Sequence, residues 1–475
     1  MREKGRLPAR LAIGVSVVVL VSVAGCKAQL GQEGNEPGKN GAVQVASGPT
    51  LNGILPAQVD LPADAPDPLT FRPNFDDFSW RSFIALMWPA SNVRGEPANP
   101  TQPTTLTGAG NAYNAVWGTF RADYELYTGP NRPPPFDGPN GPAPFCGGVK
   151  RELVKFSKLG DPLSDTKEAF SFPLVDQNNN YIYYEIRFNR DQYGFVRGAD
   201  TQPASWLYLA ANLMKAEQAG PVSMPTASAQ PYSQGSVMVK AAWKLLTPKD
   251  DASRYYTQSV SVYDSTQPAG QKCQTMTVGL IGFHIGRKLA RFPEWVWSSF
   301  EQVDNVPPDQ GSPAGPMTLN NGTDTPKTVG GWANRPDSDQ PTAKRSPTQV
   351  TRFNPIPVTP APAPGSGPWP YGAGSTVDVN NAYRQLLAGT VWANYQLVIT
   401  QWPSNPSTFK TKEAGGLYPQ GAGSPFPQQG AVNTAMETYF QSQRDAAGAG
   451  GNSCMQCHYG AGQSDFSWSL TLRAK

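Results

Sequence analysis

Residues 274–286 read QTMTVGLIGFHIG, and this stretch decides the fold of the chain. Apolar residues and glycine fill nearly every position, so a strand formed here would be buried on both faces. The pattern therefore predicts a central strand of a sheet. Simple alternation along this strand places His284 on the same face as Met276, Val278 and Leu280.

The segments around this strand predict an α+β fold. Residues 171–189 alternate in polarity after an asparagine-rich turn and predict a hairpin, and residues 236–247 predict another strand. Residues 74–90 predict a buried helix that Asn74 caps and Pro89 ends. Further helical patterns cover residues 111–127, 380–402 and 433–445. We expect a loop-rich single large domain with an antiparallel sheet and several helices.

Composition indicates a packed fold with many connecting loops. The 475 residues include 47 Gly and 48 Pro, which favour loops, but also 12 Trp and 39% hydrophobic residues, which favour a large core. Residues 309–374 consist almost entirely of Pro, Gly, Ser, Thr and Asn and show no periodicity. So long a segment is typical of a surface loop or insertion, here within a body predicted to span residues 66–430.

The N-terminus predicts export. Arg2, Lys4, Arg6 and Arg10 precede an uncharged run over residues 11–25, which is typical of a secretory signal peptide. The apolar run is too short to span a bilayer comfortably. We therefore interpret residues 1–25 as a signal peptide.

The end of this segment predicts a lipid anchor. Its last residues, Val23 to Cys26, read VAGC and resemble a bacterial lipobox, in which cleavage leaves an N-terminal cysteine that carries lipid. Cys26 would then attach the protein to a membrane. The alternative is an ordinary secreted protein in which Cys26 is left free or removed. Residues 26–65 are rich in Gly, Asn, Pro and Ala and predict a flexible tether.

Charge argues against a nucleic-acid partner. Residues 1–25 hold four basic residues and one acidic residue of the totals of 39 and 36, which leaves 35 of each in the rest of the chain. A nucleic-acid binder usually has a basic excess, so no such partner is expected. Export permits disulfides, and Cys146 and Cys273 are the candidate pair.

The most specific motif lies near the C-terminus, where Cys454, Cys457 and His458 form CMQCH. C-x-x-C-H is the attachment site of a c-type haem, in which two thiols form thioethers and the histidine binds the iron. The motif predicts one covalent haem c. A zinc site usually places the histidine further away, and a redox dithiol usually accompanies a thioredoxin-like βαβ pattern, so both alternatives are weaker.

Few residues follow the motif, so most of the haem pocket must come from earlier segments. Residues 431–475 are the predicted attachment segment. The aromatic side chains expected to exclude water from the haem are equally compatible with an ordinary core; they are Phe440, Tyr459, Phe466 and Trp468.

The sixth iron ligand has several candidates. His284 is the only other histidine and the first choice, although a buried histidine satisfied by hydrogen bonds fits its pattern equally well. Met436 and Met276 are alternatives, whereas Met455 lies inside the C-x-x-C loop and could hardly cross the ring. An open sixth position is the third option. Arg287 and Lys288 follow the strand and could pair with the haem propionates.

Several blocks resemble a large bacterial family of exported monohaem proteins called cytochrome c family proteins. The resemblance covers about residues 71–470 without the Pro-rich insertion, and it implies that Cys454, Cys457 and His458 attach haem. Gln302 stands where many relatives are expected to have a histidine. The blocks are FSWRSFIALMWPA (78–90), PLVDQNNNYIYYEIRFNR (173–190), GLIGFHIGRKLARFPEWVWSSFEQVDNVP (279–307), NYQLVITQWP (394–403), METYFQ (436–441) and SCMQCHYGAGQSDFSWSL (453–470).

These features predict an electron-transfer lipoprotein of the cell envelope, located at the outer membrane and facing the periplasm. Its expected redox partner is a protein or the quinone pool. One alternative is a haem-dependent periplasmic oxidoreductase, either peroxidase-like or a dehydrogenase that uses haem as its electron outlet, and another is a binding module with a structural haem. The two histidines cannot complete a Ser-His-Asp triad or an H-E-x-x-H site without giving up the haem ligand.

Overall fold

The strand β8 (Cys273–Arg287) runs through the middle of the sheet in the computed structural model of the chain. Along one edge β8 pairs with β6 (Val237–Leu245), and along the other it pairs with β7 (Thr257–Tyr263) and β9 (Val296–Gln302). Each of these pairings is antiparallel. The predicted central strand is therefore confirmed, and so is the predicted strand over residues 236–247.

The structure describes residues 49–61, 71–141, 144–147, 151–153, 173–264, 267–308, 317–322, 334, 345–358, 375–404, 406, 425–426, 432–440 and 454–474. The predicted signal peptide, Cys26 and most of the Pro-rich insertion lie outside these residues. Two described pieces of the insertion meet in a small core cluster, where Leu319 and Val350 are buried. Leu55 and Val59, from the last part of the predicted tether, are also buried against the body.

The described strands form an open sheet that does not close into a barrel. Its order is β1-β3-β6-β8-β9-β10-β11, with β7 beside β8 and β2 beside β7. Only the short β2–β7 pairing is parallel. The other strands of this sheet are β1 (Arg121–Ala122), β2 (Glu152–Leu153), β3 (Tyr183–Phe188), β10 (Tyr395–Pro403) and β11 (Pro425–Phe426), and a separate ribbon pairs β4 (Ser228–Ala229) with β5 (Tyr232–Ser233).

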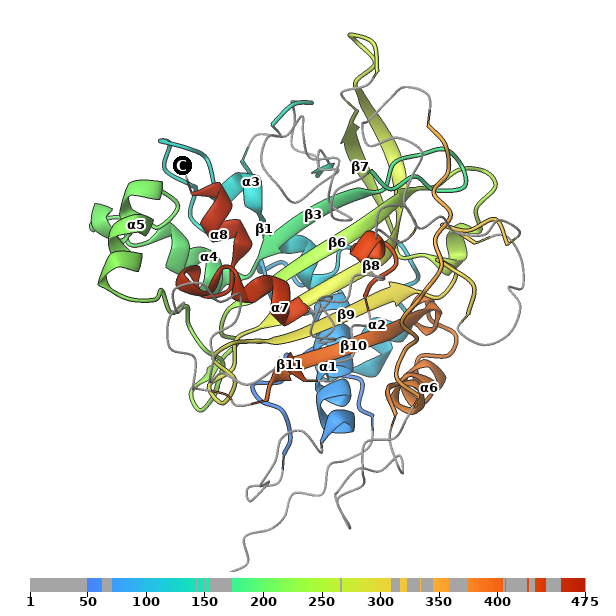
Figure 1. Cartoon of the computed structure of the whole chain (residues 1–475), viewed down its shortest axis with the longest axis horizontal. Helices are drawn as coiled ribbons and strands as arrows, with labels where there is room; N and C mark the ends of the chain where they lie inside the picture. Colours follow the sequence, from blue (N-terminus) through green and yellow to red (C-terminus); the bar gives the residue numbers. More distant parts are fainter. Residues whose placement is uncertain are drawn as a thin grey trace, which may run out of the picture. The chain divides into compact units, whose positions relative to one another are not determined.

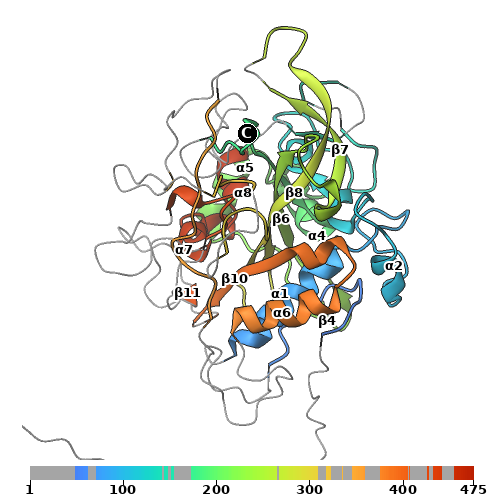
Figure 2. The same ribbon diagram turned by 90° about the vertical axis from the view of Figure 1, so that its right-hand side faces the viewer.

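Helices cover both faces of this sheet. Figures 1 and 2 show α1 and α6 on one face and α7 and α8 on the other. The expected α+β fold with an antiparallel sheet is confirmed at this level. The helices of the described residues are α1 (Arg72–Met87), α2 (Pro103–Thr107), α3 (Asp123–Leu126), α4 (Arg190–Arg197), α5 (Ala210–Ala219), α6 (Thr376–Leu386), α7 (Cys454–Tyr459) and α8 (Trp468–Arg473).

The helix α1 is buried nearly all round and bonded to the sheet through its polar side chains. The Ser79 hydroxyl lies 2.7 Å from the Ser298 hydroxyl on β9 and 2.8 Å from the Thr400 hydroxyl on β10. A helix enclosed on all sides needs such partners for its buried polar groups. The aromatic ring of Phe83 stacks on Phe300 of β9, with centroids 4.3 Å apart.

The start of α1 differs from the prediction. The helix begins at Arg72, with Pro73 in its first turn, where a missing N–H costs nothing. Asn74 is therefore inside the helix and does not cap it; its side-chain amide donates to the carbonyl of Asp60 at 2.7 Å. The helix ends at Met87, before Pro89, as expected.

Three predicted helices are wrong in part. Residues 111–127 form a short 3-10 turn, the strand β1 and the single turn α3 instead of one helix. In residues 380–402, the first part is helical, but Tyr395–Pro403 is the strand β10. Of the helix predicted over residues 433–445, residues 441–445 lie outside the described part of the structure, and within residues 433–440 only Thr438–Phe440 forms a helical turn, of the 3-10 type. The hairpin over residues 171–189 is present, with Val175 opposite Tyr181 and β3 following.

Candidate functional site

The C-x-x-C-H motif lies on the single helix α7. Cys454, Cys457 and His458 occupy positions i, i+3 and i+4, which lie on the same side of an α-helix. All three side chains are partly exposed. Met455 and Tyr459 lie on the next side of the helix and are buried in the core. The fold thus anchors α7 by its apolar side chains and gathers the two thiols and the imidazole beside them.

A backbone carbonyl orients the imidazole ring of His458. Its Nδ1 lies 2.7 Å from the carbonyl oxygen of Phe466, so Nδ1 must carry the proton and donate it. In the neutral imidazole, the lone pair then lies on Nε2. Histidines that bind a metal commonly have their second nitrogen fixed in this way.

The same ring stacks on the sheet. The centroid of the Trp297 indole on β9 lies 3.9 Å from that of the His458 imidazole, and the two planes are inclined by 29°. The backbone N–H of Met455 donates to the side-chain oxygen of Gln401 on β10 at 3.4 Å. These contacts place α7 against β9 and β10.

The loop after α7 is fixed to the end of β8. The carboxylate of Asp465 accepts hydrogen bonds from the ammonium group of Lys288, at 2.6 Å from Oδ1, and from the backbone N–H of Met224, also at 2.6 Å. Burial raises the pKa of this carboxyl, although the Lys288 ammonium favours its charged form. Asp465 and Phe466 both adopt positive φ angles, of 53° and 62°. The turn that supplies the Phe466 carbonyl is therefore held by a buried ion pair.

This arrangement changes the roles expected for two cations. Lys288 is buried against Asp465 and does not extend toward solvent. Arg287 is also buried and donates to the Ser82 hydroxyl and the Pro56 carbonyl on the α1 side of the sheet. The suggestion that these residues pair with haem propionates is not supported by the partners the structure gives them.

A β-bulge places His284 on the face of the sheet that α7 covers. Leu280 pairs with Trp243 and Gly282 pairs with Ala242, so one extra residue of β8 lies between them. Trp243 and Ala242 are consecutive and point to opposite faces. His284 therefore does not share a face with Met276, Val278 and Leu280, and the expectation that it does is wrong.

The neighbours of His284 confirm its position. It pairs with Ser299 of β9, and Trp297 lies two residues from Ser299 on the same face. The Nε2 atom of His284 lies 3.3 Å from a carboxylate oxygen of Glu437, and the ammonium group of Lys240 lies 3.9 Å from the other oxygen. The two histidines, 174 positions apart by their residue numbers, thus lie on one face of the sheet.

The candidate methionine ligands Met436 and Met276 also lie on opposite faces of the sheet. Met436 is buried on the His284 face, since a Cβ added to Gly282 would lie 3.2 Å from its methyl carbon. Met276 lies on the opposite face and packs against the main core. Met455 is fully buried beneath α7. Of these three side chains, only Met436 shares the surroundings of His284.

The aromatic residues expected near the motif are partly in place. Tyr459 and Phe466 are buried, with ring centroids 5.6 Å apart. Trp468 is partly exposed, and its indole N–H donates to the carbonyl of Cys457 at 2.9 Å. The side chain of Phe440 lies outside the described part of the structure. Gln302 donates a hydrogen bond to the Asp304 carboxylate at 3.0 Å. Within the described residues, none of its side-chain hydrogen bonds reaches α7.

Sequence reasoning missed three partners of the site: Trp297, Glu437 and the Asp465 carboxylate. Each reaches its partner only through the tertiary fold. A signal existed for Trp297, because the alternation of Trp295 and Trp297 predicts two aromatic rings near one sheet face. No local pattern distinguishes Glu437 or Asp465 from a solvent-exposed acid.

The cysteines of the body are joined. Cys146 and Cys273 form a disulfide, with Cα atoms 5.5 Å apart. The bond links a loop to the start of β8, next to the stacked rings of Phe145 and Tyr263.

Comparison with protein-family models, with curated proteins and with solved structures found no match to the chain. Within the described residues, no three His, Cys, Asp or Glu side chains are arranged to hold a metal ion. Among the same residues, no helix has the length and apolar character needed to span a membrane.

Proposed function

We propose that this chain is a c-type monohaem cytochrome that transfers electrons at the bacterial cell envelope, in the manner of the exported cytochrome c family proteins. The observation that carries the proposal is the arrangement of the C-x-x-C-H motif. Two thiols and one imidazole occupy one side of a helical turn, and a backbone carbonyl fixes the imidazole tautomer. This donor set is the one that haem c requires.

The residues present fit the cofactor. Cys454 and Cys457 would hold the haem through thioethers, and His458 would bind its iron through Nε2. When bound, the haem supplies an iron that takes up and releases single electrons. The Phe466 carbonyl keeps the proton on Nδ1 of His458, and the Trp297 indole limits rotation of the ring and shields it from water.

His284 is the proposed sixth ligand. It lies on the same sheet face as Trp297, which contacts His458, and Gly282 and Gly286 on either side of it add no side chains to this face. Met436 shares these surroundings and is the alternative, whereas Met276 lies on the other face. The competing role for His284 is its contact with Glu437, which is an ion pair only when the imidazole is protonated.

The proposed location is the outer membrane, with a lipid on Cys26 and the protein facing the periplasm. The charge pattern of residues 1–25 and the VAGC sequence support export and lipidation. The Cys146–Cys273 disulfide also supports export, because disulfides persist in oxidising compartments. The partner would be a redox protein or the quinone pool, and no nucleic acid is expected.

The spectrum of the purified protein tests this function. The experiment uses protein made in a host that attaches haem c, measured optically and magnetically in both redox states. A six-coordinate low-spin iron that does not react with carbon monoxide or peroxide supports an electron carrier. A five-coordinate high-spin iron that reacts with peroxide contradicts it and favours a haem-dependent oxidoreductase.

Variants distinguish the candidate ligands. His284→Ala should convert the iron to a high-spin or altered low-spin form, whereas Met436→Leu should leave it unchanged. Met276→Leu is the matched control on the opposite face, and Glu437→Gln tests the ion pair without removing the imidazole. If only Met436→Leu changes the spectrum, the assignment of His284 is wrong.

A further inference from the structure

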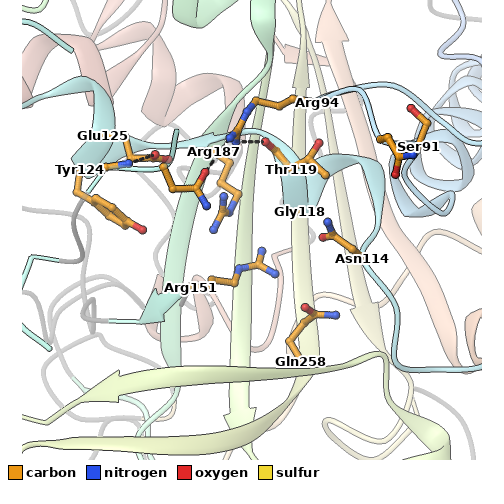
Figure 3. Close-up of a pocket in the computed structure, with 13 residues that line it drawn as sticks. Ser91, Arg94, Asn114, Gly118, Thr119, Tyr124, Glu125, Arg151, Arg187 and Gln258 are labelled. Atoms are coloured by element: carbon orange, nitrogen blue, oxygen red, sulfur yellow. Dashed lines mark hydrogen bonds between the residues drawn. The ribbon is translucent and has the colours of Figure 1, made fainter. Parts of the chain in front are cut away.

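A polar cavity of about 360 Å³ lies on the face of the sheet opposite α7. Arg187 extends into it from β3, on the same face as Trp243 and therefore opposite His284. Figure 3 shows Arg94, Arg151 and Arg187 converging from separate parts of the chain. A volume of this size lies at the lower end of the range for small-molecule sites, so the cavity suits a small ligand.

The cavity has more positive than negative charge. A single carboxylate, that of Glu185, accepts hydrogen bonds from Nε of Arg151 at 2.9 Å and from Nε of Arg187 at 2.7 Å. The second carboxylate at the cavity, Glu125, is paired with the buried guanidinium of Arg121 at 2.6 Å. Two guanidinium groups therefore share one negative charge.

Arg94 adds a second unbalanced charge. Its guanidinium donates to the carbonyls of Thr119 at 2.9 Å and Gly138 at 3.3 Å, and to the side-chain oxygen of Asn140 at 2.7 Å. All three acceptors are neutral. Burial, together with the nearby charge of Arg121, lowers the pKa of Arg94. Arginine nevertheless stays charged in proteins, so the described residues give the cavity an excess of about two positive charges.

The cations are fixed in position before any ligand binds. The guanidinium carbon of Arg151 lies 4.6 Å from the centre of the Trp117 ring, and Arg187 also donates to the carbonyl of Phe120 at 2.6 Å. Stacked or bonded guanidinium groups lose little conformational entropy when an anion binds to them. The cavity is thus a preorganised site and not a set of mobile surface chains.

The remaining lining residues indicate a hydrophilic ligand. Among the described residues that line the cavity, none has an aliphatic side chain, and the one aromatic ring is that of Tyr124. Most ligand pockets instead have largely apolar walls that hold the body of the ligand. The neutral polar side chains are Ser91, Asn92, Asn114, Thr119, Tyr124, Asn140 and Gln258.

We propose that this cavity, defined by Arg94, Arg151 and Arg187, binds a small hydrophilic dianion such as a phosphate or a short dicarboxylate. Arg151 and Arg187 share one carboxylate, and the hydrogen-bond partners of Arg94 are neutral. An anion with two negative charges would therefore balance the charge of the site. The planar forks of arginine match the oxygens of both anion classes. The proposal is independent of haem attachment, because the cavity and α7 lie on opposite faces of the sheet.

Calorimetric titration of the full purified protein tests the site. The probes are inorganic phosphate, glucose 6-phosphate and malonate, with glucose as the uncharged control and benzoate as the monoanionic control. Binding of at least one dianion and of neither control supports the proposal. Tighter binding of glucose 6-phosphate than of phosphate would identify a phosphate monoester as the ligand, and a preference for malonate would identify a dicarboxylate. No binding of any dianion at millimolar concentration overturns the proposal.

Three variants locate the binding. Arg94→Gln should weaken dianion binding about tenfold or more, the usual effect of losing one charged hydrogen-bond partner. Arg254→Gln is the matched control, because it removes the same charge from a partly exposed residue that pairs with Asp304 outside the cavity. Asn114→Asp adds a negative charge at an exposed lining position, and it should weaken binding even if Arg94→Gln fails to fold. Equal affinity in Asn114→Asp and in the wild type contradicts the site.

Discussion

The indole of Trp297 stacks on the imidazole of His458, with ring centroids 3.9 Å apart. Trp297 belongs to the central sheet, whereas His458 belongs to a short helix near the end of the chain. The contact therefore connects the C-x-x-C-H motif to the central sheet. Trp297 is 5% exposed, so its ring is a packing element as well as a neighbour of the proposed iron ligand.

Replacing this indole should destabilise the protein. Trp297→Ala is expected to lower the free energy of unfolding by about 3–5 kcal/mol, because a large buried side chain is removed and leaves a cavity. Trp297→Phe keeps a ring against His458 and should cost less than half as much. Denaturant unfolding measures both changes. A loss below about 0.5 kcal/mol for Trp297→Ala, the range of ordinary surface substitutions, would show that the stack contributes nothing.

The buried pair of Lys288 and Asp465 should behave as one unit. Each single change, Lys288→Met or Asp465→Asn, is expected to lower the free energy of unfolding by about 3–5 kcal/mol, because the other charge loses its partner in the interior. The double variant should lose less than the sum of the two. Unfolding of all four proteins gives the coupling energy.

The exposed pair of Arg190 and Asp137 is the control for this experiment. Its coupling energy should not exceed about 1 kcal/mol, because solvent screens exposed charges. If the losses of unfolding free energy in the Lys288 and Asp465 single variants are additive in the double variant, the pair does not fix the loop that presents the Phe466 carbonyl.

The buried carboxyl of Asp76 should make stability depend on pH. Burial raises its pKa to about 6 from 3.8, although the hydroxyls of Thr400 and Thr376 favour the charged form. A raised pKa means that the folded state holds the proton more tightly. The stabilisation is therefore complete below about pH 4 and is lost as the pH rises through 6.

Asp76→Asn removes this titration and isolates it from that of the other acids. Between pH 4 and pH 7, the wild type should lose up to about 3 kcal/mol of stability relative to the variant, since one pKa unit corresponds to about 1.4 kcal/mol. Unfolding measured across this range gives the difference. A constant difference between the two proteins would contradict the raised pKa.

The periodicity of the sequence predicted the elements that keep a regular pattern. α1, β6 and β8 form where the pattern predicts them, because their long runs of apolar residues favour buried elements. The sequence predicts a continued helix over residues 394–402, because NYQLVITQW follows a helical stretch. Residues 395–403 instead form β10, because pairing with β9 overrides the local pattern.

The bulge in β8 explains why the candidate site was only partly predictable. Strict alternation assigns His284 to the face of Leu280, but one extra residue before Gly282 reverses this assignment. Nothing in the sequence distinguishes a bulge from a regular strand here. The motif residues themselves can be identified from the sequence, because Cys454, Cys457 and His458 are neighbours along the chain. Their partners Trp297 and Glu437 come from distant segments that only the fold brings together.

The disulfide between Cys146 and Cys273 should stabilise the body. It joins residues 127 positions apart, and closing so long a loop removes much of the entropy of the unfolded chain. Replacing both cysteines by serine is expected to lower the free energy of unfolding by about 2–5 kcal/mol. Reduction of the wild type with a thiol should reproduce the effect. Equal stability of the variant and the oxidised wild type would contradict this role.

The most direct test of the central claim is the intact mass of the protein made in a host that attaches haem c. The wild type should be heavier than its lipidated polypeptide by one haem, remain coloured after denaturation, and lose both properties in a Cys454→Ser, Cys457→Ser double variant. Colourless wild-type protein, with the mass of the polypeptide and lipid alone, would contradict the assignment of the motif as a haem attachment site.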